Sequence, residues 1–325
     1  MEMNRALGLA ISGAAALLQS AAPVRSQETI FPKNTPIEIT VLFPAGSSPD
    51  ITARVFGQVL AGHLGAGVMV VNRPGAGGAI GYRHVAGQKP DGHSLVWISG
   101  SIATAYHLGL LAFDYAAFEP VARVLVESPL VAVRGDSRWA SLGELIAEAK
   151  SRPSEITVGN SGRGSDTHIS SVALFKSAAV EILEVPFPLA QVVPILLGGH
   201  VDALVELPAA LSNPVKTGSV RLLAALAPGR DPALPDVPTA QEQGHHVSME
   251  IWRGIAAPRG TSVGVVAVLE AAIRKTVQSP EFVRASGQLG VRPAFMPSIE
   301  FAALIDREHR RLGRMMEAVG LTKQP

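Results

Sequence analysis

Two short loops combine small residues with hydroxyl side chains and could bind an anion. The first is Pro44-Ala45-Gly46-Ser47-Ser48-Pro49-Asp50, and the second runs from Ser161 to Thr167. Each follows a predicted strand and precedes a predicted helix. Backbone N–H groups at a helix start lack partners and carry partial positive charge, so they attract anions. If the loops face each other, they predict a site for a small carboxylate. The alternative is that both are ordinary turns with helix caps.

Three other patterns resemble known sites, but each departs from the motif it resembles. Gly75-Ala76-Gly77-Gly78 is followed by Ala79-Ile80, so the dinucleotide-binding fingerprint misses its last glycine. Gly159-Asn160-Ser161-Gly162-Arg163 ends in arginine where the hydrolase elbow needs glycine. The His245-His246 pair lies in a polar turn and is expected at the surface. The sequence therefore predicts no cofactor, no metal site and no catalytic residues.

Alternating strands and helices are expected to position the two loops. In the first half, strands are predicted at 37–43, 68–71 and 95–98, and helices after residue 51 and at 79–87. Pro129 interrupts a predicted strand at 125–133. The second half has predicted strands at 157–160, 182–185, 203–206 and 220–226, and helices from 141 and at 168–177, 262–278 and 298–319. This alternation predicts two similar α/β lobes with parallel strands.

Composition excludes several classes of protein. The chain has 325 residues, no cysteine, and 28 basic against 27 acidic side chains. Without cysteine there are no disulfides, thiolate metal sites or cysteine nucleophiles. The balanced charge argues against a nucleic-acid partner, which usually requires a basic face. Length alone favours two domains.

The N-terminus resembles a secretory signal peptide. Arg5 precedes an uncharged run of about 13 residues from Ala6 to Leu18, which is shorter than the roughly 20 residues that span a bilayer. Val24-Arg25-Ser26 ends in a small residue, which places cleavage before Gln27. The alternative is an uncleaved anchor. An exported chain without cysteine fits a bacterial periplasm.

From residue 36 to about 320 the chain resembles the periplasmic solute receptors of tripartite tricarboxylate transporters, the Bug (Bordetella uptake gene) family. The two most specific segments are Asn72-Arg73-Pro74-Gly75-Ala76-Gly77-Gly78 and Leu234-Pro235-Asp236-Val237-Pro238-Thr239. Further matching segments, in the expected order, are 41–46, 90–95, 118–121, 159–162 and 197–203, followed by Trp252 and Gly254.

The resemblance implies a two-lobe periplasmic-binding-protein fold of type II, with two Rossmann-like lobes joined by two crossover strands. Its expected parts are a signal peptide at 1–26, lobe 1 at 27–128, lobe 2 at 129–250, and a return to lobe 1 at 251–325. The implied function is non-catalytic capture of a small organic acid or amino acid by a monomer that serves transporter membrane subunits. A sensing module that feeds a signalling partner and an exported enzyme acting on an organic acid are the alternatives.

The resemblance also carries ligand contacts onto positions of this chain. They are Ala45, Gly46, Ser47 and Asp50 in the first loop, Ser99 and Ser101 in a strand-end turn, and Ser161, Gly162, Ser165 and Thr167 in the second loop.

Three departures from the family pattern bear on the ligand. Phe187-Pro188-Leu189 replaces a Tyr-Lys-Gly segment, so a ligand contact could be missing there. We hypothesise that Arg163 binds a second carboxylate, because arginine suits bidentate pairing, and that Glu206 faces a ligand amine or hydroxyl. The alternatives are a solvated loop arginine and a glutamate without a ligand role.

Overall fold

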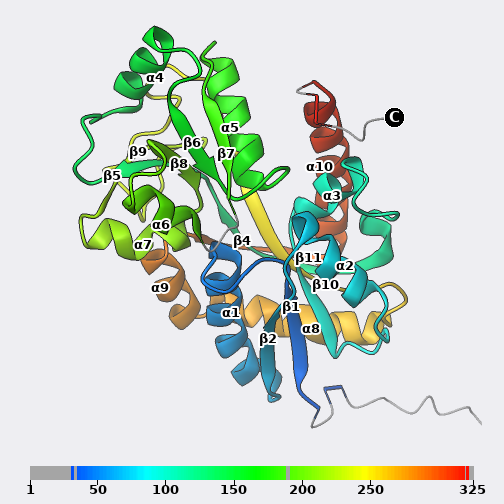
Figure 1. Cartoon of the computed structure of the whole chain (residues 1–325). Helices are drawn as coiled ribbons and strands as arrows, with labels where there is room; N and C mark the ends of the chain where they lie inside the picture. Colours follow the sequence, from blue (N-terminus) through cyan, green and yellow to red (C-terminus); the bar gives the residue numbers. More distant parts are fainter. Residues whose placement is uncertain (1–30, 33–34, 188–190, 319, 322–325) are drawn as a thin grey trace, which may run out of the picture. The chain divides into compact units, whose positions relative to one another are not determined.

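The structure, a computed structural model, describes residues 31–32, 35–187, 191–318 and 320–321 (Figure 1). Its contacts divide the chain into residues 1–30 and 31–325, and both lobes lie in the second unit. The predicted signal peptide and the departure at Pro188 and Leu189 lie outside the described residues. None of the described helices is both long and apolar enough to cross a membrane.

The first lobe is built on a six-stranded sheet with the strand order β11-β4-β10-β3-β1-β2. Its strands are β1 (Ile37–Val41), β2 (Val68–Asn72), β3 (Ser94–Ile98), β4 (Phe118–Glu127), β10 (Ile251–Pro258) and β11 (Arg292–Pro297). β1 pairs in parallel with β2 and β3, whereas β10 pairs antiparallel with β3 and β4. The helices are α1 (Ser48–Leu64), α2 (Ala79–Ala86), α3 (Ser101–His107), α8 (Val263–Gln278), α9 (Pro280–Gln288) and α10 (Ser298–Ala318), with short 3-10 turns at Ala76–Gly78 and Tyr115–Ala117.

The second lobe is built on a five-stranded sheet with the order β7-β6-β8-β5-β9. Its strands are β5 (Leu130–Arg134), β6 (Thr157–Asn160), β7 (Leu183–Pro186), β8 (Ala203–Glu206) and β9 (Val220–Ala225). β6 pairs in parallel with β7 and β8, and β5 pairs antiparallel with β8 and β9. Its helices are α4 (Leu142–Ser151), α5 (Asp166–Ser177), α6 (Val192–Leu197) and α7 (Pro208–Lys216).

The two lobes share one topology. In each, a central strand has two parallel neighbours, and an antiparallel crossover strand follows one of them. Beyond the crossover strand the first lobe adds two antiparallel strands, β4 and β11, and the second lobe adds one, β9. β10 fills the crossover position in the first lobe, and β5 fills it in the second. The predicted fold class, two α/β lobes joined by crossover strands, is confirmed.

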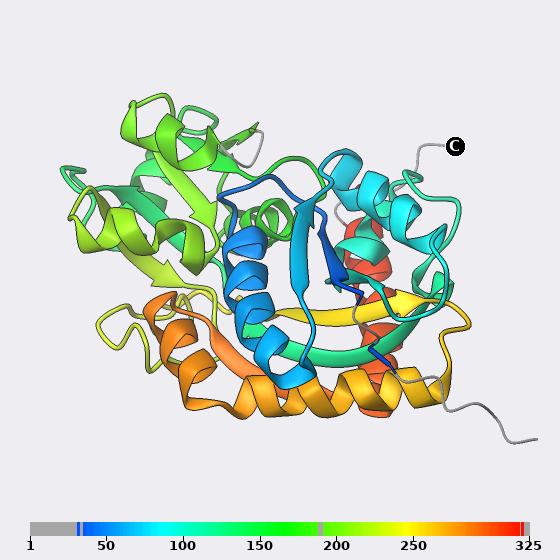
Figure 2. The ribbon, with the colours of Figure 1, turned by 90° about the horizontal axis from the view of Figure 1, so that it is seen from below.

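The chain enters the second lobe between β4 and β5 and returns between β9 and β10. Figure 2 shows the long strands β4 and β10 side by side, with α8 along them. Their register places Ile251 opposite Glu127 and Arg253 opposite Leu125. Because side chains alternate between sheet faces, Glu127 and Arg253 lie on one face, on neighbouring strands.

Serine caps explain several helix starts. Ser141 accepts the Glu144 N–H at the start of α4, and Ser262 accepts the Val265 N–H at the start of α8. Both starts agree with the sequence prediction. The helices α6 and α7 and the strand β11 were not predicted, because proline breaks the pattern expected of regular elements. The short helix α9 was also not predicted. Pro194 and Pro214 lie inside α6 and α7, and two prolines bound β11.

The C-terminal helix contributes to the cores of both lobes. Phe301 and Ile305 pack with Trp252 in a core of the first lobe. Met316, near the end of α10, lies instead in the core of the second lobe with Phe175. The single helix α10 is therefore packed into the cores of both lobes.

Candidate functional site

The first predicted loop is held in shape by its own side chains. Gly46 has a φ of +81°, a conformation that glycine adopts without strain, and its N–H donates to Asp50 Oδ2 at 2.9 Å. Ser47 stands at the N-cap of α1, and its hydroxyl donates to the Pro44 carbonyl at 2.6 Å. Ala45 and Gly46 are exposed, whereas Ser47 and Asp50 are buried. The Asp50 carboxylate is therefore turned into the protein, where it engages the Gly46 N–H.

Asp50 fastens this loop to the neighbouring strand. Its Oδ1 accepts from Asn72 Nδ2 at 2.8 Å and pairs with Arg54 at 2.8 Å. Burial favours the neutral acid, but the hydrogen bonds from Arg54, Gly46 and Asn72 outweigh it and hold the pKa of Asp50 below its usual range. Asn72 also donates to the Phe43 carbonyl at 2.9 Å. These contacts give Asp50 a positioning role, and its predicted ligand contact stays a prediction.

The strand-end turn after β3 holds a small buried hydroxyl cluster. The Ser99 hydroxyl donates to Ser101 Oγ at 2.9 Å, and the Tyr82 hydroxyl lies 2.9 Å from the same oxygen. Ser99 and Ser101 are 0% and 1% exposed. Their hydroxyls are thus already engaged with one another and with Tyr82.

The second predicted loop is ordered around the start of α5. Ser165 caps the helix by accepting the His168 N–H at 3.1 Å, and Thr167 Oγ1 accepts the Ser161 N–H at 3.0 Å. Gly162, with φ +99°, donates its N–H to Asn160 at 3.2 Å. The loop is therefore a compact turn whose hydroxyls hold the backbone of its own residues.

Glu206 ends β8 directly beside this loop. It is 1% exposed, accepts from the Ser161 hydroxyl at 2.6 Å, and accepts the Leu207 N–H at 2.7 Å. Burial raises the pKa of Glu206 to about 7, although the hydrogen bonds from Ser161 and Leu207 act in the opposite direction. A carboxyl group that changes charge near neutrality therefore lies under the second loop.

One pocket joins the two lobes at their loops and has a volume of about 490 Å³. On the first-lobe side it is lined by Phe43, Pro44 and residues 74–78, and on the second-lobe side by Ser161, Gly162, Arg163, Ser165, Pro186 and Phe187. The structure thus brings four predicted site residues of the second loop to one pocket with the backbone of the first lobe. Ala45, Gly46, Ser47, Asp50, Ser99, Ser101, Thr167 and Glu206 are not among its lining residues.

Arg163 is the cationic side chain among the residues that line this pocket. It is exposed, and within the described residues it makes no hydrogen bond or ion pair. Its charge contributes, after burial, to lowering the pKa of His168 in the same loop. The arrangement fits the hypothesis of a second-carboxylate contact, which stays a prediction.

A smaller pocket adjoins the first and shares Phe43, Ser161 and Ser165 with it. Its volume is about 10 Å³, and its other lining residues are Pro49, Asp166, Thr167, Leu207 and Arg253. Sequence reasoning missed Arg253, Asp166 and the lining role of 74–78. Arg253 lies in an apolar strand 126 positions from Glu127, its partner, so no local pattern connects the two.

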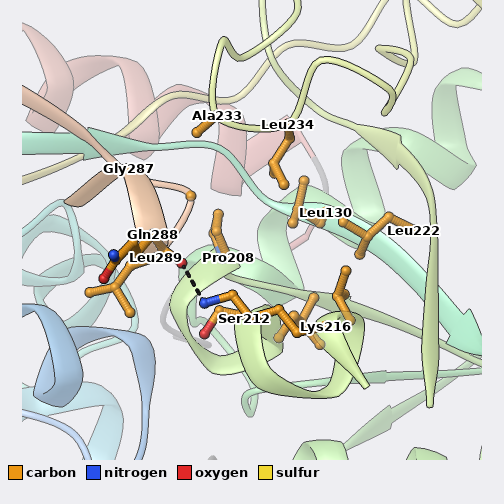
Figure 3. A pocket seen from close by; sticks show the side chains of 13 residues that line it. Leu130, Pro208, Ser212, Lys216, Leu222, Ala233, Leu234, Gly287, Gln288 and Leu289 are labelled. Carbon is orange, nitrogen blue, oxygen red and sulfur yellow. Dashed lines mark hydrogen bonds between the residues drawn. The ribbon is translucent and has the colours of Figure 1, made fainter. Parts of the chain in front are cut away.

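A third pocket lies away from the two loops, and its lining is largely apolar. Its volume is about 270 Å³, and leucines at 130, 211, 222, 234 and 289 contribute much of its lining (Figure 3). The nearby Lys216 donates Nζ to the Gln288 carbonyl at 3.4 Å. An apolar lining whose cation is already engaged is a poor site for a small anion.

Comparison with known proteins places this geometry among solute receptors. A family model described as the tripartite tricarboxylate transporter family receptor matches residues 52–321. The protein BugT of Bordetella pertussis (strain Tohama I) is 32% identical over 292 residues, covering 88% of this chain and 89% of BugT.

Two solved structures extend the comparison to three dimensions. The periplasmic binding protein BugD superposes with a TM-score of 0.84 at 28% identity, covering 90% of this chain and 100% of BugD. MatC from Rhodopseudomonas palustris, solved with bound malate, superposes with a TM-score of 0.79 at 29% identity, covering 88% and 99%.

Proposed function

This chain belongs to the family of tripartite tricarboxylate transporter receptors, and we propose that it captures a small organic acid between its two lobes. The observation that carries the proposal is the 490 Å³ pocket lined by residues 74–78 of the first lobe and Ser161, Gly162 and Arg163 of the second. Its volume lies in the range of small-molecule sites. MatC, a structural neighbour, holds malate, which supports a carboxylate ligand.

The chemistry of the lining fits an anion of this size. Backbone and hydroxyl groups at the start of α5 lie on one side, and the glycine-rich segment Gly75–Gly78 lies on the other. Arg163 supplies a positive charge for a second carboxylate. Because contacts come from both lobes, ligand binding favours the closed arrangement over the open one.

The remaining features of the proposal follow from the family. We propose that residues 1–26 direct export to the periplasm, with lobe boundaries near 128/129 and 250/251. The mature chain then acts as a monomer, converts no substrate, and delivers its ligand to transporter membrane subunits. These statements are proposals for this chain, supported by the likeness to the periplasmic binding protein BugD.

A thermal-shift screen of the chain from residue 27 tests the receptor function. The panel contains mono-, di- and tricarboxylates and amino acids, with isothermal titration calorimetry for each hit. A ligand at about 100 times its Kd adds roughly 2.7 kcal/mol to the free energy of unfolding, which is readily measured. Absence of any hit, or chemical turnover of a hit, contradicts the proposal.

Arg163→Ala tests the second-carboxylate contact, with Arg284→Ala as the matched control. Arg284 is an exposed arginine on α9 that lines neither of the loop pockets. We expect Arg163→Ala to weaken a dicarboxylate about tenfold and a monocarboxylate much less, because a charge-assisted hydrogen bond contributes about 1.5 to 3 kcal/mol. Equal losses for the two ligands would assign Arg163 to general attraction rather than to the second carboxylate.

A further inference from the structure

A buried charge cluster lies where the crossover strands meet the cleft. Arg253 of β10 and Glu127 of β4 have side-chain exposures of 2% and 0%, and Arg253 Nε donates to Glu127 Oε1 at 2.8 Å. The Ser48 hydroxyl, at the start of α1, donates to the other carboxylate oxygen at 2.7 Å. Both oxygens of Glu127 are therefore occupied, and Glu127 fixes the orientation of the guanidinium.

Arg253 also lines the small pocket, and one of its terminal nitrogens lacks a hydrogen-bond partner in the part of the chain that the structure describes. Arg253 Nη1 is buried and has no hydrogen-bond partner among the described residues, although Arg253 lines the pocket with Ser161 and Ser165. An unpartnered N–H of a buried cation is costly unless another group accepts from it. The atom is therefore a donor available to a group that enters this pocket.

Asp166 lines the same pocket and forms an ion pair with Arg253 without a hydrogen bond. It is the first residue of α5, has a side-chain exposure of 11%, and lies with Oδ2 3.8 Å from Arg253 Nη1. That distance is too long for a hydrogen bond, and within the described residues the Asp166 carboxyl group accepts none. A donor and an acceptor of opposite charge thus lie 3.8 Å apart on residues that both line the pocket.

We infer that Arg253 and Asp166 form a subsite for a zwitterion, so that the ligand is an amino acid rather than a plain organic acid. The ligand carboxylate accepts from Arg253 Nη1, and its ammonium group donates to Asp166. This inference rests on the proposed function and narrows the ligand class of the same cleft. The opposite charges of an α-amino acid sit on one carbon, which matches two protein groups that are neighbours.

The balance of charge around the cleft floor favours an ammonium group. Arg253 is flanked by the carboxyl groups of Glu127 and Asp166, so these two outnumber it. Arg311 also acts on Asp166 but is itself paired with Glu308, and the nearby Glu206 has a pKa raised to about 7. A plain dicarboxylate would add negative charge to this surplus in a region from which water is excluded. An amino acid brings a positive charge for Asp166 together with its carboxylate.

The ligand reaches this subsite from the larger pocket. The two pockets share Phe43, Ser161 and Ser165, and the smaller one has a volume of only about 10 Å³. Asp166 of the second lobe lies 3.8 Å from Arg253 of the crossover strand β10 at this point. A ligand group enters when the lobes part and is enclosed when they close.

Calorimetry with ligands of matched carbon skeletons tests the inference on the chain from residue 27. One set is L-aspartate, L-malate and succinate, and another is L-alanine, L-lactate and propionate, with all standard amino acids screened by thermal shift first. We expect at least one amino acid to bind about thirtyfold or more tightly than its hydroxy and unsubstituted counterparts. This size follows from losing one partner of a desolvated charge pair.

Two variants separate the roles of the charged groups. Asp166→Asn, nearly equal in shape, should cost about thirtyfold for the amino acid and less than threefold for the unsubstituted acid. Asp236→Asn is the control and should change neither, because Asp236 is exposed and its side chain makes no hydrogen bond or ion pair with the part of the chain that the structure describes. Arg253→Lys should weaken both ligand types, because both carboxylates accept from the guanidinium. If Arg253→Lys does not fold, the double variant Glu127→Gln/Arg253→Met removes both buried charges and serves instead.

The outcomes distinguish this inference from the receptor function. Equal or tighter binding of the malate or succinate type, or unchanged amino acid affinity in Asp166→Asn, overturns the zwitterion subsite and leaves the receptor proposal standing. Unchanged amino acid affinity in a folded Arg253 variant also overturns it. Failure of the wild-type chain to bind any amino acid or organic acid refutes the receptor proposal itself.

Discussion

Replacing Glu206 by glutamine should stabilise the protein in a manner that depends on pH. Glu206 is buried at the end of β8, and burial raises its pKa to about 7 from 4.5, even though Ser161 and Leu207 donate to it. Glutamine resembles the protonated acid in shape and carries no charge. Ionising the buried carboxyl group of Glu206 lowers the free energy of unfolding, and the variant removes this loss.

The size of the effect follows from the difference between the folded and unfolded pKa values. Below pH 4.5 the group is protonated in both states and contributes nothing. Between pH 4.5 and 7 the unfolded chain ionises while the folded chain keeps its proton, so stability falls as pH rises. Above pH 7 the loss levels off at about 3 kcal/mol, at 1.36 kcal/mol per pH unit.

Thermal unfolding at closely spaced pH values from 4.5 to 8 measures this difference. We expect Glu206→Gln and wild type to melt together near pH 4.5, with the variant about 5 °C higher at pH 8. Glu281→Gln, at an exposed glutamate in the first turn of α9, is the control and should follow the wild-type curve.

A constant difference across the range would show that glutamine acts by packing rather than by removing a charge. A variant that is less stable at pH 8 would refute the reasoning outright. It would mean that the ionised carboxylate, with its bonds to Ser161 and Leu207, is the preferred form in the folded chain.

Three further substitutions have expected effects on stability that urea unfolding can check. Ser165→Ala should cost about 1 kcal/mol, because Ser165 caps α5 by accepting the His168 N–H, and a loss below about 0.3 kcal/mol contradicts this. Gly254→Ala should cost more than about 2 kcal/mol, since an added Cβ overlaps the Phe301 ring and lies 2.6 Å from the Ala122 carbonyl oxygen; a neutral result would show that the crossover strand shifts freely. Asn72→Ala should cost about 1 to 2 kcal/mol by freeing Asp50 and the Phe43 carbonyl, whereas an unchanged midpoint would show that Arg54 and Gly46 hold the loop alone.

Short-range patterns in the sequence were sufficient to predict much of the fold. Alternating apolar residues marked strands such as Ile37–Val41, and Ser141 marked the start of a helix, because these signals act between residues a few positions apart. The strand at Arg292–Pro297 was missed since each of its residues is only half-buried and prolines bound it. The signal for such a strand lies in its pairing with β4, which is distant in sequence.

The positions of the two loops were predictable from the sequence, whereas the contacts of their side chains were not. The loop at Ser161–Thr167 was expected at a strand end and lies there, with Ser161, Gly162, Arg163 and Ser165 on a pocket between the lobes. The sequence did not predict that the Asp50 carboxylate contacts Arg54 and Asn72, and its ligand contact stays a prediction. Tertiary packing decides which oxygen accepts from a given N–H group. Residue types and their spacing do not specify that packing.

The buried pair at the crossover strands explains how closure can depend on a ligand. Arg253 and Glu127 lie on strands that pair with each other, so lobe movement leaves their hydrogen bond intact. Asp166 lies on the second lobe and approaches to 3.8 Å without forming a hydrogen bond. Closing the lobes without ligand therefore removes water from Asp166 without giving its carboxylate a hydrogen bond. This burial raises the pKa of Asp166. A ligand that supplies the missing acceptor for Arg253 and the missing donor for Asp166 gains contacts only in the closed form, which is the condition for shifting the population toward closure.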